Sequence, residues 1–183
     1  MNAILLSAGY GKRLWPLTKN KPKCLIDIFE GENLLNLWIK KLIKLNVKKI
    51  IVNTHFKDNL IRNFIKKSKY KKKIQISFEK KILGTAGTLF KHKNLLKKDD
   101  LILIHSDNYC EDSLVKFLKA HQTRPKKCMI TMLTFRTDNP KSCGIVKVDK
   151  KKIVKEFHEK KKYYKGNLAN GAIYVISKNF YSD

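Results

Sequence analysis

Two glycines and three cations near the N-terminus could bind a phosphate group. The apolar run at 3–6 is followed by Gly9 and Gly11, and the cations stand at Lys12, Arg13 and Lys23. Glycine leaves backbone N–H groups accessible to phosphate oxygens, and cations balance the phosphate charge. Walker A requires Gly-Lys-Ser/Thr, and the dinucleotide fingerprint requires a third glycine where Leu14 stands. The pattern therefore predicts a phosphate site of another kind.

A single carboxylate follows another apolar run. Asp107 comes directly after 101–105 in the stretch Ser106-Asp107-Asn108. Magnesium prefers oxygen ligands and keeps several waters, so one or two carboxylates are enough to hold it. The same stretch is also typical of a helix N-cap or an Asx turn. The four cysteines and five histidines show no metal-ligand spacing.

Strand-length apolar runs alternate with stretches of helical period in the first two thirds of the chain. Strands are expected at 3–7, 49–53, 74–79, 101–105, 128–135, 144–148, 153–157 and 172–177. Helices are expected at 34–45, around 60–65, at 85–96 and around 114–118. Alternation of this kind predicts a parallel, doubly wound sheet, whose ligand crevice lies beyond the carboxyl ends of the strands. The glycine loop, 79–87 and Asp107 should meet there, with the strand-rich remainder covering the crevice.

The composition favours one globular domain. The chain has 183 residues, 43% of them hydrophobic, and shows neither a repeat nor a linker. The 41 Lys plus Arg against 15 Asp plus Glu give a net charge of +26, which suggests anionic partners. The lysines are spread along the whole chain, so a charged surface is favoured over a nucleic-acid stripe. No apolar run has membrane length, and the default is a cytoplasmic protein with reduced thiols.

Five ordered segments carry a resemblance to the sugar-phosphate nucleotidyltransferases. They cover nearly the whole chain and are 6–18 with 22–25, 83–89, 106–108, 157–160 and 170–175. The resemblance implies an α/β, Rossmann-like, doubly wound and mostly parallel sheet with a strand-rich, sugar-binding C-terminal part. It also implies a single domain over 1–183, with a nucleotide-binding half at 1–125 and a sugar-binding part at 126–183.

The family transfers a nucleoside monophosphate from a nucleoside triphosphate to a sugar 1-phosphate and releases pyrophosphate. By resemblance the catalytic residues are Arg13, Lys23 and Asp107, with Asp107 holding Mg²⁺. Arg13 would hold the departing phosphates and Lys23 the sugar phosphate. Nucleotide contacts are implied at Leu6, Ala8, Gly9, Gly11, Lys12, Glu79, Gly84 and Thr85. Sugar contacts are implied at Gly144, Glu159, Lys160 and Asn170.

The segment after Glu79 looks most like the guanylyltransferase branches, which use mannose 1-phosphate or D-glycero-D-manno-heptose 1-phosphate. Guanine offers two adjacent donors, N1–H and the 2-amino group, which one carboxylate can accept. Glu79 follows an expected strand and could reach a base in the crevice. A solvent-facing acid beside Lys80 and Lys81 is the alternative.

The resemblance also implies a second metal aspartate in a Trp-x-Asp-x-Gly-like segment, before which this chain stops. Asp183 lacks that motif and is not assigned the role. We expect either a fragment of a longer enzyme or a natural short form with impaired catalysis. The expected partners are a nucleoside triphosphate and a sugar 1-phosphate, without nucleic acid or membrane, and a homo-oligomer is left open. The alternatives are a family fold that binds without turnover and a basic nucleic-acid-binding protein.

Overall fold

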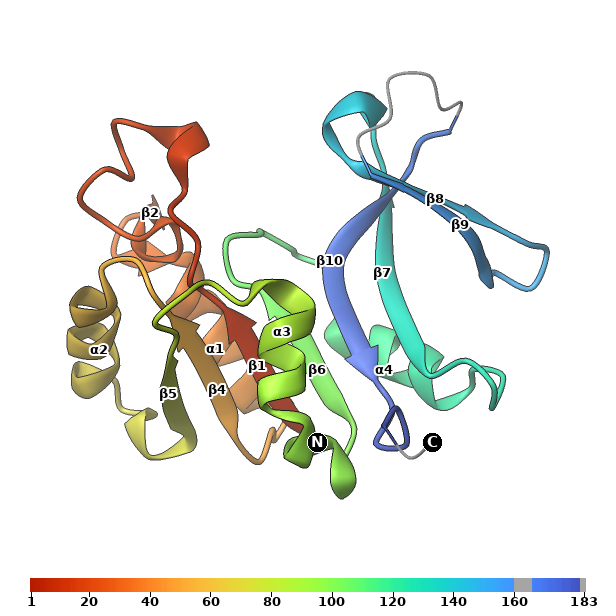
Figure 1. Ribbon diagram of the computed structural model, residues 1–183, viewed down its shortest axis with the longest axis horizontal. Helices are drawn as coiled ribbons and strands as arrows, with labels where there is room; N and C mark the ends of the chain where they lie inside the picture. Colours follow the sequence, from red (N-terminus) through yellow and green to blue (C-terminus); the bar gives the residue numbers. More distant parts are fainter. Residues whose placement is uncertain (160–165, 182–183) are drawn as a thin grey trace.

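The structure is a computed structural model that describes residues 1–159 and 166–181. Within these residues eight strands form one sheet in the order β5-β4-β1-β6-β10-β8-β9, with β7 paired to β10 outside this path. The sheet has a parallel part and an antiparallel part, which lie side by side in Figure 1. Strands β2 (Asp27–Phe29) and β3 (Glu32–Asn33) form a separate small hairpin.

Four strands of the first part run parallel. They are β1 (Asn2–Leu6), β4 (Ile50–Thr54), β5 (Ile74–Phe78) and β6 (Leu101–His105). The central strands are buried on both faces, as parallel strands between two helical layers usually are. Their carboxyl ends lie at one edge of the sheet, which is where β1 leads into the glycine loop.

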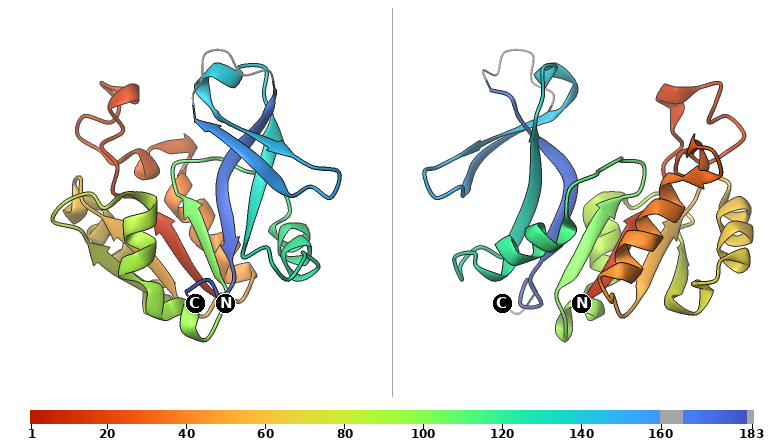
Figure 2. Two further views of the ribbon diagram at one scale, coloured as in Figure 1. Left: turned by 45° about the vertical axis from the view of Figure 1, so that its right-hand side comes forward. Right: turned by 180° about the vertical axis from the view of Figure 1, so that it is seen from behind.

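Helices cover both faces of the parallel strands. These helices are α1 (Leu34–Lys44), α2 (Asp58–Lys67), α3 (Gly84–Lys91) and α4 (Leu114–Gln122). Buried side chains of α1, α2 and α4 pack on one face, and those of α3 pack on the other. The two views in Figure 2 show α1 and α3 on opposite sides. Asn33 starts α1 because its side chain accepts the Asn36 N–H at 3.0 Å.

The later strands pair antiparallel and continue the same sheet. They are β7 (Ile130–Arg136), β8 (Gly144–Val148), β9 (Val154–Glu159) and β10 (Leu168–Ile176). Strand β10 joins the two parts, because it pairs with β6 through Ile173–Ile176 and with β8 at Ala169. Its register against β7 shifts between Asn170 and Tyr174, and Ala172 in this bulge has a φ of 52°.

The predicted α/β, doubly wound fold is confirmed, with the parallel arrangement in the first part of the chain. Several boundaries differ from those expected. The helix expected at 85–96 ends at Lys91 and is followed by a 3₁₀ turn at Lys93–Lys97, and β10 begins at Leu168 instead of 172. The β2–β3 hairpin was not predicted. Among the described helices, none has the length and apolar character needed to cross a membrane.

Candidate active site

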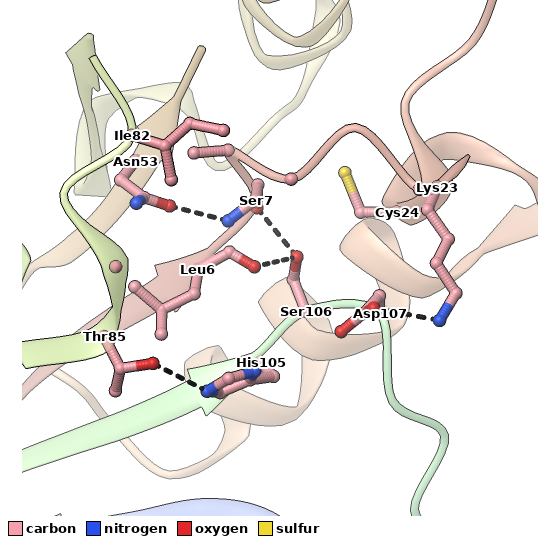
Figure 3. A pocket seen from close by; sticks show the side chains of 14 residues that line it. Leu6, Ser7, Lys23, Cys24, Asn53, Ile82, Thr85, His105, Ser106 and Asp107 are labelled. Carbon is pink, nitrogen blue, oxygen red and sulfur yellow. Dashed lines mark hydrogen bonds and ion pairs between the residues drawn. The ribbon is translucent and has the colours of Figure 1, made fainter. Parts of the chain in front are cut away.

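A cavity of about 200 Å³ lies where the carboxyl ends of β1, β4 and β6 meet (Figure 3). Eight predicted residues line it: Leu6, Ala8, Gly9, Gly11, Lys23, Gly84, Thr85 and Asp107. The glycine loop, the start of α3 and the turn after β6 therefore meet at one cavity, as the sequence predicted. Two predicted nucleotide residues, Lys12 and Glu79, are not among those that line this cavity.

The glycine loop takes a conformation that favours glycine at one position. Gly11 has a φ of 66°, and a Cβ added there would lie 3.2 Å from the Thr18 side chain. Thr18 in turn donates to the Gly11 carbonyl at 2.8 Å. A Cβ added at Gly9 would meet nothing within 4 Å, so the space above Gly9 is open. The loop thus presents accessible backbone to the cavity.

Buried hydroxyl groups connect the ends of β1 and β6 beneath the loop. Ser106 Oγ donates to the Leu6 carbonyl at 2.8 Å, and Ser7 Oγ lies 2.8 Å from Ser106 Oγ. Cys24 lines the same cavity, and burial raises the pKa of its thiol to about 12. The thiol is therefore neutral at pH 7. Cys24 was not itself predicted as a site residue, although it lies in the segment 22–25 next to Lys23.

Lys23 and Asp107 form an ion pair in the cavity. Lys23 Nζ lies 2.9 Å from Asp107 Oδ2, and both side chains are partly exposed. Lys23 begins a 3₁₀ turn after Pro22, whereas Asp107 stands in the turn after β6, 84 residues away. The alternative in which Asp107 caps a helix is wrong, because α4 begins at Leu114 with Ser113 as its N-cap residue.

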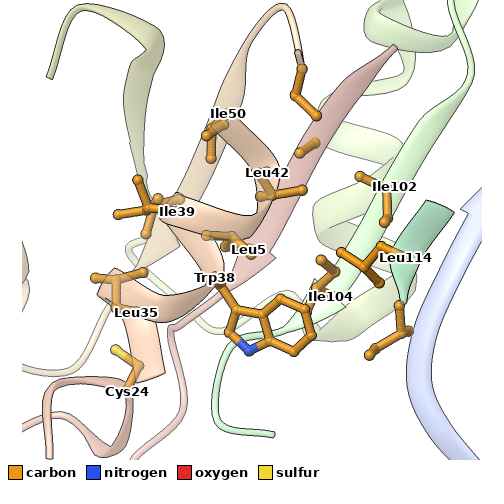
Figure 4. Packing of buried hydrophobic residues seen from close by; sticks show 14 of the residues in the cluster. Leu5, Cys24, Leu35, Trp38, Ile39, Leu42, Ile50, Ile102, Ile104 and Leu114 are labelled. Carbon is orange, nitrogen blue, oxygen red and sulfur yellow. The ribbon is translucent and has the colours of Figure 1, made fainter. Parts of the chain in front are cut away.

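The turn that carries Asp107 is held by the core and by β10. Trp38 Nε1 donates to the Asn108 carbonyl at 2.9 Å, and Asn108 Nδ2 donates to the Gly171 carbonyl at 2.9 Å. Trp38 is fully buried among residues of α1, β1, β6 and α4 (Figure 4). A buried indole N–H usually needs a hydrogen-bond acceptor. Here the acceptor is the Asn108 carbonyl, so the hydrogen bond holds the turn next to Asp107.

Glu79 occupies a different environment from the one predicted. Its side chain is 2% exposed, so the alternative of a solvent-facing acid is wrong. Oε1 accepts from Asn53 Nδ2 at 3.0 Å and from Thr88 Oγ1 at 2.6 Å, and Oε2 accepts from the Leu83 N–H at 3.1 Å. Three groups of the protein itself thus donate to the carboxylate that was predicted to accept from guanine.

The charge of Glu79 is maintained by these hydrogen bonds. Burial raises the pKa of its carboxyl, but the hydrogen bonds from Thr88, Asn53 and the Leu83 N–H outweigh burial. The net effect is a pKa below the ordinary value of 4.5. Glu79 is therefore an ionised group inside the protein at pH 7.

A second, larger cavity of about 880 Å³ adjoins the first. The predicted residues Gly144, Glu159 and Asn170 line it together with Arg13. Arg13 lies in the 3₁₀ turn Lys12–Leu14 and lines the larger cavity, whereas Gly9 and Gly11 of the glycine loop line the first. The predicted sugar contact at Lys160 lies outside the described residues.

Sequence analysis missed His105 and Asn53, which both line the first cavity. His105 lines the second cavity as well, as does the predicted residue Thr85, and His105 Nε2 lies 3.2 Å from Thr85 Oγ1. Burial lowers the pKa of His105 below 6.5 against the opposing effect of Asp107, so the ring is neutral at pH 7. The signal available in the sequence was a polar residue at the carboxyl end of an apolar strand. His105 ends β6 in this way, and Asn53 stands near the end of β4.

Residues 2–182 match the family model described as nucleotidyl transferase. The chain is 30% identical over 183 residues to a mannose-1-phosphate guanyltransferase of Debaryomyces hansenii, covering 97% of this chain and 50% of that protein. It is 31% identical over 183 residues to mannose-1-phosphate guanylyltransferase 1 of Arabidopsis thaliana, with the same coverage. The chain thus spans about half the length of the curated relatives it matches.

Solved structures share the fold. HddC from Yersinia pseudotuberculosis, crystallised with GMP-PN, superposes with a TM-score of 0.77 at 25% identity, covering 97% of this chain and 77% of that one. A Bacillus anthracis protein crystallised with sucrose gives a TM-score of 0.85 at 22% identity, covering 100% of this chain and 73% of that one. At 22% identity the second likeness concerns the fold alone.

Proposed function

The chain belongs to the nucleotidyl transferase family, and we propose that it transfers a nucleoside monophosphate from a nucleoside triphosphate to a sugar 1-phosphate. An oxygen of the sugar phosphate bonds to the α-phosphorus while the bond to the β-phosphate oxygen breaks, and pyrophosphate leaves. The observation that carries the proposal is the Lys23–Asp107 pair, which lies in one cavity with the open backbone of the glycine loop.

The residues suit a reaction between two anions. The attacking oxygen is already negatively charged, so the site needs alignment and charge compensation instead of a general base. Backbone N–H groups at Gly9 and Gly11 bind the triphosphate, and Lys23 holds the sugar phosphate near the α-phosphate. Arg13 offers a planar fork for phosphate oxygens from the adjoining cavity. Lys12, exposed beside this loop, adds positive charge.

Asp107 suits a magnesium ion. Its carboxylate lines the cavity, and substrate phosphates and water supply the other oxygens that Mg²⁺ prefers. No cluster of three or more metal-binding side chains occurs within 1–159 and 166–181, and this metal needs none when phosphates complete its shell. When bound, the ion offsets negative charge on the transferred phosphoryl group.

We assign GTP as the nucleotide and mannose 1-phosphate or a heptose 1-phosphate as the acceptor. The support is the naming of the relatives and the GMP-PN complex of HddC. The sugar would occupy the larger cavity, against Gly144, Glu159 and Asn170. Asn170 is oriented by its own bulge, since its Oδ1 accepts the Ala172 N–H at 2.8 Å and its Nδ2 donates to Tyr174 Oη at 2.6 Å.

We treat 1–183 as one domain, with the nucleotide half at 1–125 and the sugar part at 126–183. The continuous sheet supports a single domain, because β10 of the second part pairs with β6 of the first. We place the reaction in the cytoplasm. All four cysteines are unpaired, which is the usual state of thiols in a reducing compartment.

The test is pyrophosphate release by the purified protein. Each common nucleoside triphosphate is combined with mannose, heptose or glucose 1-phosphate, with and without Mg²⁺. We expect release only when metal, GTP and an acceptor are all present. No release in any combination would overturn the proposal, and nucleotide binding without release would identify a binding module that retains the family fold.

A further inference from the structure

A buried polar network at Glu79 connects both sides of the first cavity, and the proposed reaction does not use it directly. Glu79, Asn53 and Thr88 are all buried, and they lie on three different segments of the chain. Asn53 connects this network to the start of the glycine loop, because its Oδ1 accepts the Ser7 N–H at 2.6 Å.

The carboxylate sets the direction of this chain of hydrogen bonds. An ionised carboxylate only accepts, so Asn53 must turn its NH₂ group toward Glu79. The carbonyl oxygen of Asn53 is then left facing Ser7, the first residue after β1. The Ser7 N–H can only donate and requires the same orientation, so the Asn53 amide links Glu79 directly to the start of the glycine loop.

The backbone of Glu79 holds the middle of the same loop. His55 Nδ1 lies 2.7 Å from the Glu79 carbonyl, and His55 Nε2 lies 3.0 Å from Tyr10 Oη. A carbonyl only accepts, so Nδ1 carries the proton, and in the neutral ring Tyr10 donates to Nε2. Tyr10 stands between Gly9 and Gly11. Two routes thus lead from one residue to two points of the loop.

The opposite wall of the cavity is attached to the same carboxylate. Glu79 Oε2 accepts the Leu83 N–H, and Leu83 directly precedes Gly84 and Thr85 of the cavity lining. Oε1 accepts from Thr88, one turn into α3. The glycine loop and the start of α3 are thus held at a fixed separation by one buried anion.

We propose that Glu79 is a positioning residue that fixes the glycine loop and the start of α3 relative to each other, in the arrangement that binds the phosphates. This inference rests on the proposed function and gives Glu79 a role in binding the phosphates of any nucleotide. Direct contact with a guanine base makes the opposite prediction, because it would affect GTP alone. Tripolyphosphate carries no base, so its binding distinguishes the positioning role from direct contact with guanine.

The sign of the effect is informative. A buried negative charge near the phosphates opposes anion binding, so loss of charge alone should strengthen the binding of tripolyphosphate. In Glu79→Gln the new NH₂ group must face Leu83 N–H or the donors from Asn53 and Thr88, because both oxygens accept in the native protein. If Glu79 positions the loop, binding of GTP, UTP and tripolyphosphate weakens about 5- to 100-fold, and by similar factors.

A double exchange, Asn53→Asp combined with Glu79→Gln, offers a rescue. The new amide at position 79 donates where the carboxylate formerly accepted. The new carboxylate at position 53 accepts both that amide and the Ser7 N–H, and the net charge is unchanged. We expect tripolyphosphate to bind this double variant more tightly than it binds Glu79→Gln, although the carboxylate now stands at position 53, which lines the cavity. Glu156→Gln, the same change on a partly exposed residue of β9 that pairs with Lys147, serves as the control and should leave affinity unchanged.

Calorimetry with each ligand and amide NMR of Ser7 and Leu83 decide the question. The positioning role requires both amide resonances to move in Glu79→Gln and to return in the double variant, whether or not the protein turns over. Weakening confined to GTP, or tighter tripolyphosphate binding in Glu79→Gln, would overturn the inference. Amide resonances that do not return in a folded double variant would also overturn it. Wild-type protein that binds no nucleotide would overturn the proposed function, while the NMR result still judges the network.

Discussion

The two adjoining cavities are built differently. The smaller lies at the ends of parallel strands, where buried groups such as Ser7, Asn53 and Glu79 are hydrogen-bonded to one another. The larger is lined by the antiparallel strands, and Phe157 and Glu159 beside it are exposed. Helices cover both faces of the first part, whereas none of the described helices covers the β8–β9 pair (Figure 2).

This difference separates two tasks. Phosphate chemistry is the same for every substrate pair and benefits from groups that are fixed before binding. Sugar recognition has to fit one particular ligand, and in the proposed function it would rest on side chains that have room to move. We therefore expect substitutions in the first cavity to affect phosphate binding, the chemical step or the fold. Substitutions of Gly144, Glu159 or Asn170 in the second should affect sugar binding alone.

The largest effect is expected at Asp107. Asp107→Asn keeps the shape but loses the charge that would hold the metal, so kcat should fall by about three orders of magnitude. Asp27→Asn is the matched control, because Asp27 pairs with Lys21 at 3.2 Å in a similar exposed ion pair. Pyrophosphate release and thermal unfolding are measured for both. Near wild-type turnover of Asp107→Asn at limiting Mg²⁺ would make Asp107 a purely structural residue.

Lys23→Met should come next. The charge-assisted contact to the sugar phosphate is lost, so the KM for the sugar phosphate should rise about 10- to 100-fold while the KM for GTP changes little. Lys21→Met removes the same charge from the partner of Asp27 and is the control. Steady-state kinetics with each substrate varied in turn separate the two constants. An equal rise in both KM values would mean that Lys23 contributes to the electrostatic potential of the whole cavity and does not contact the sugar phosphate specifically.

The pH dependence of stability tests whether charge holds the first cavity together. The pKa of Glu79 is lower in the folded protein than the ordinary 4.5. Its carboxylate therefore contributes fully above about pH 4.5, and the contribution is lost as the pH falls through the lower, folded value. Glu79→Gln should unfold at pH 7 with a free energy lower by about 1–3 kcal/mol.

That deficit should shrink below pH 4.5, because a protonated carboxyl, like the amide, carries a donor toward Leu83 or Thr88. Urea unfolding of both proteins at pH 7, 5 and 3.5 gives the difference at each pH. A deficit that stays constant down to pH 3.5 would show that shape, instead of charge, makes the residue necessary.

Sequence reasoning succeeded where a local pattern decides the structure. The strands at 101–105 and 144–148 agree with β6 and β8 at both ends, since each apolar run is bounded by polar or glycine residues. The start of β10 was missed because Asn170 and Gly171 interrupt its apolar pattern, and they belong to a bulge. The buried hydrogen bonds of Glu79 were missed for another reason. Its partner Asn53 lies 26 residues away, and only the register of β4 beside β5 brings them together.

The smallest effect is expected at Gly144, in the open cavity. A Cβ there would lie 2.7 Å from Glu159 Oε2 and 2.7 Å from Phe157 Cζ, so both side chains must shift. These are the ends of flexible side chains, and Phe157 is 46% exposed, so stability should fall by less than about 1 kcal/mol. Gly144→Ala should therefore raise the KM for the sugar phosphate about threefold and leave the KM for GTP unchanged.

Gly11→Ala provides the contrast to Gly144→Ala from the first cavity. Its φ of 66° and the Thr18 contact at 3.2 Å make any side chain strained there, so it should lose more stability and bind GTP more weakly. Thermal unfolding and the two KM values are measured for both variants. A larger loss of stability in Gly144→Ala than in Gly11→Ala would contradict the division into a fixed and an adaptable cavity, because the β8–β9 pair would then be the more tightly packed of the two.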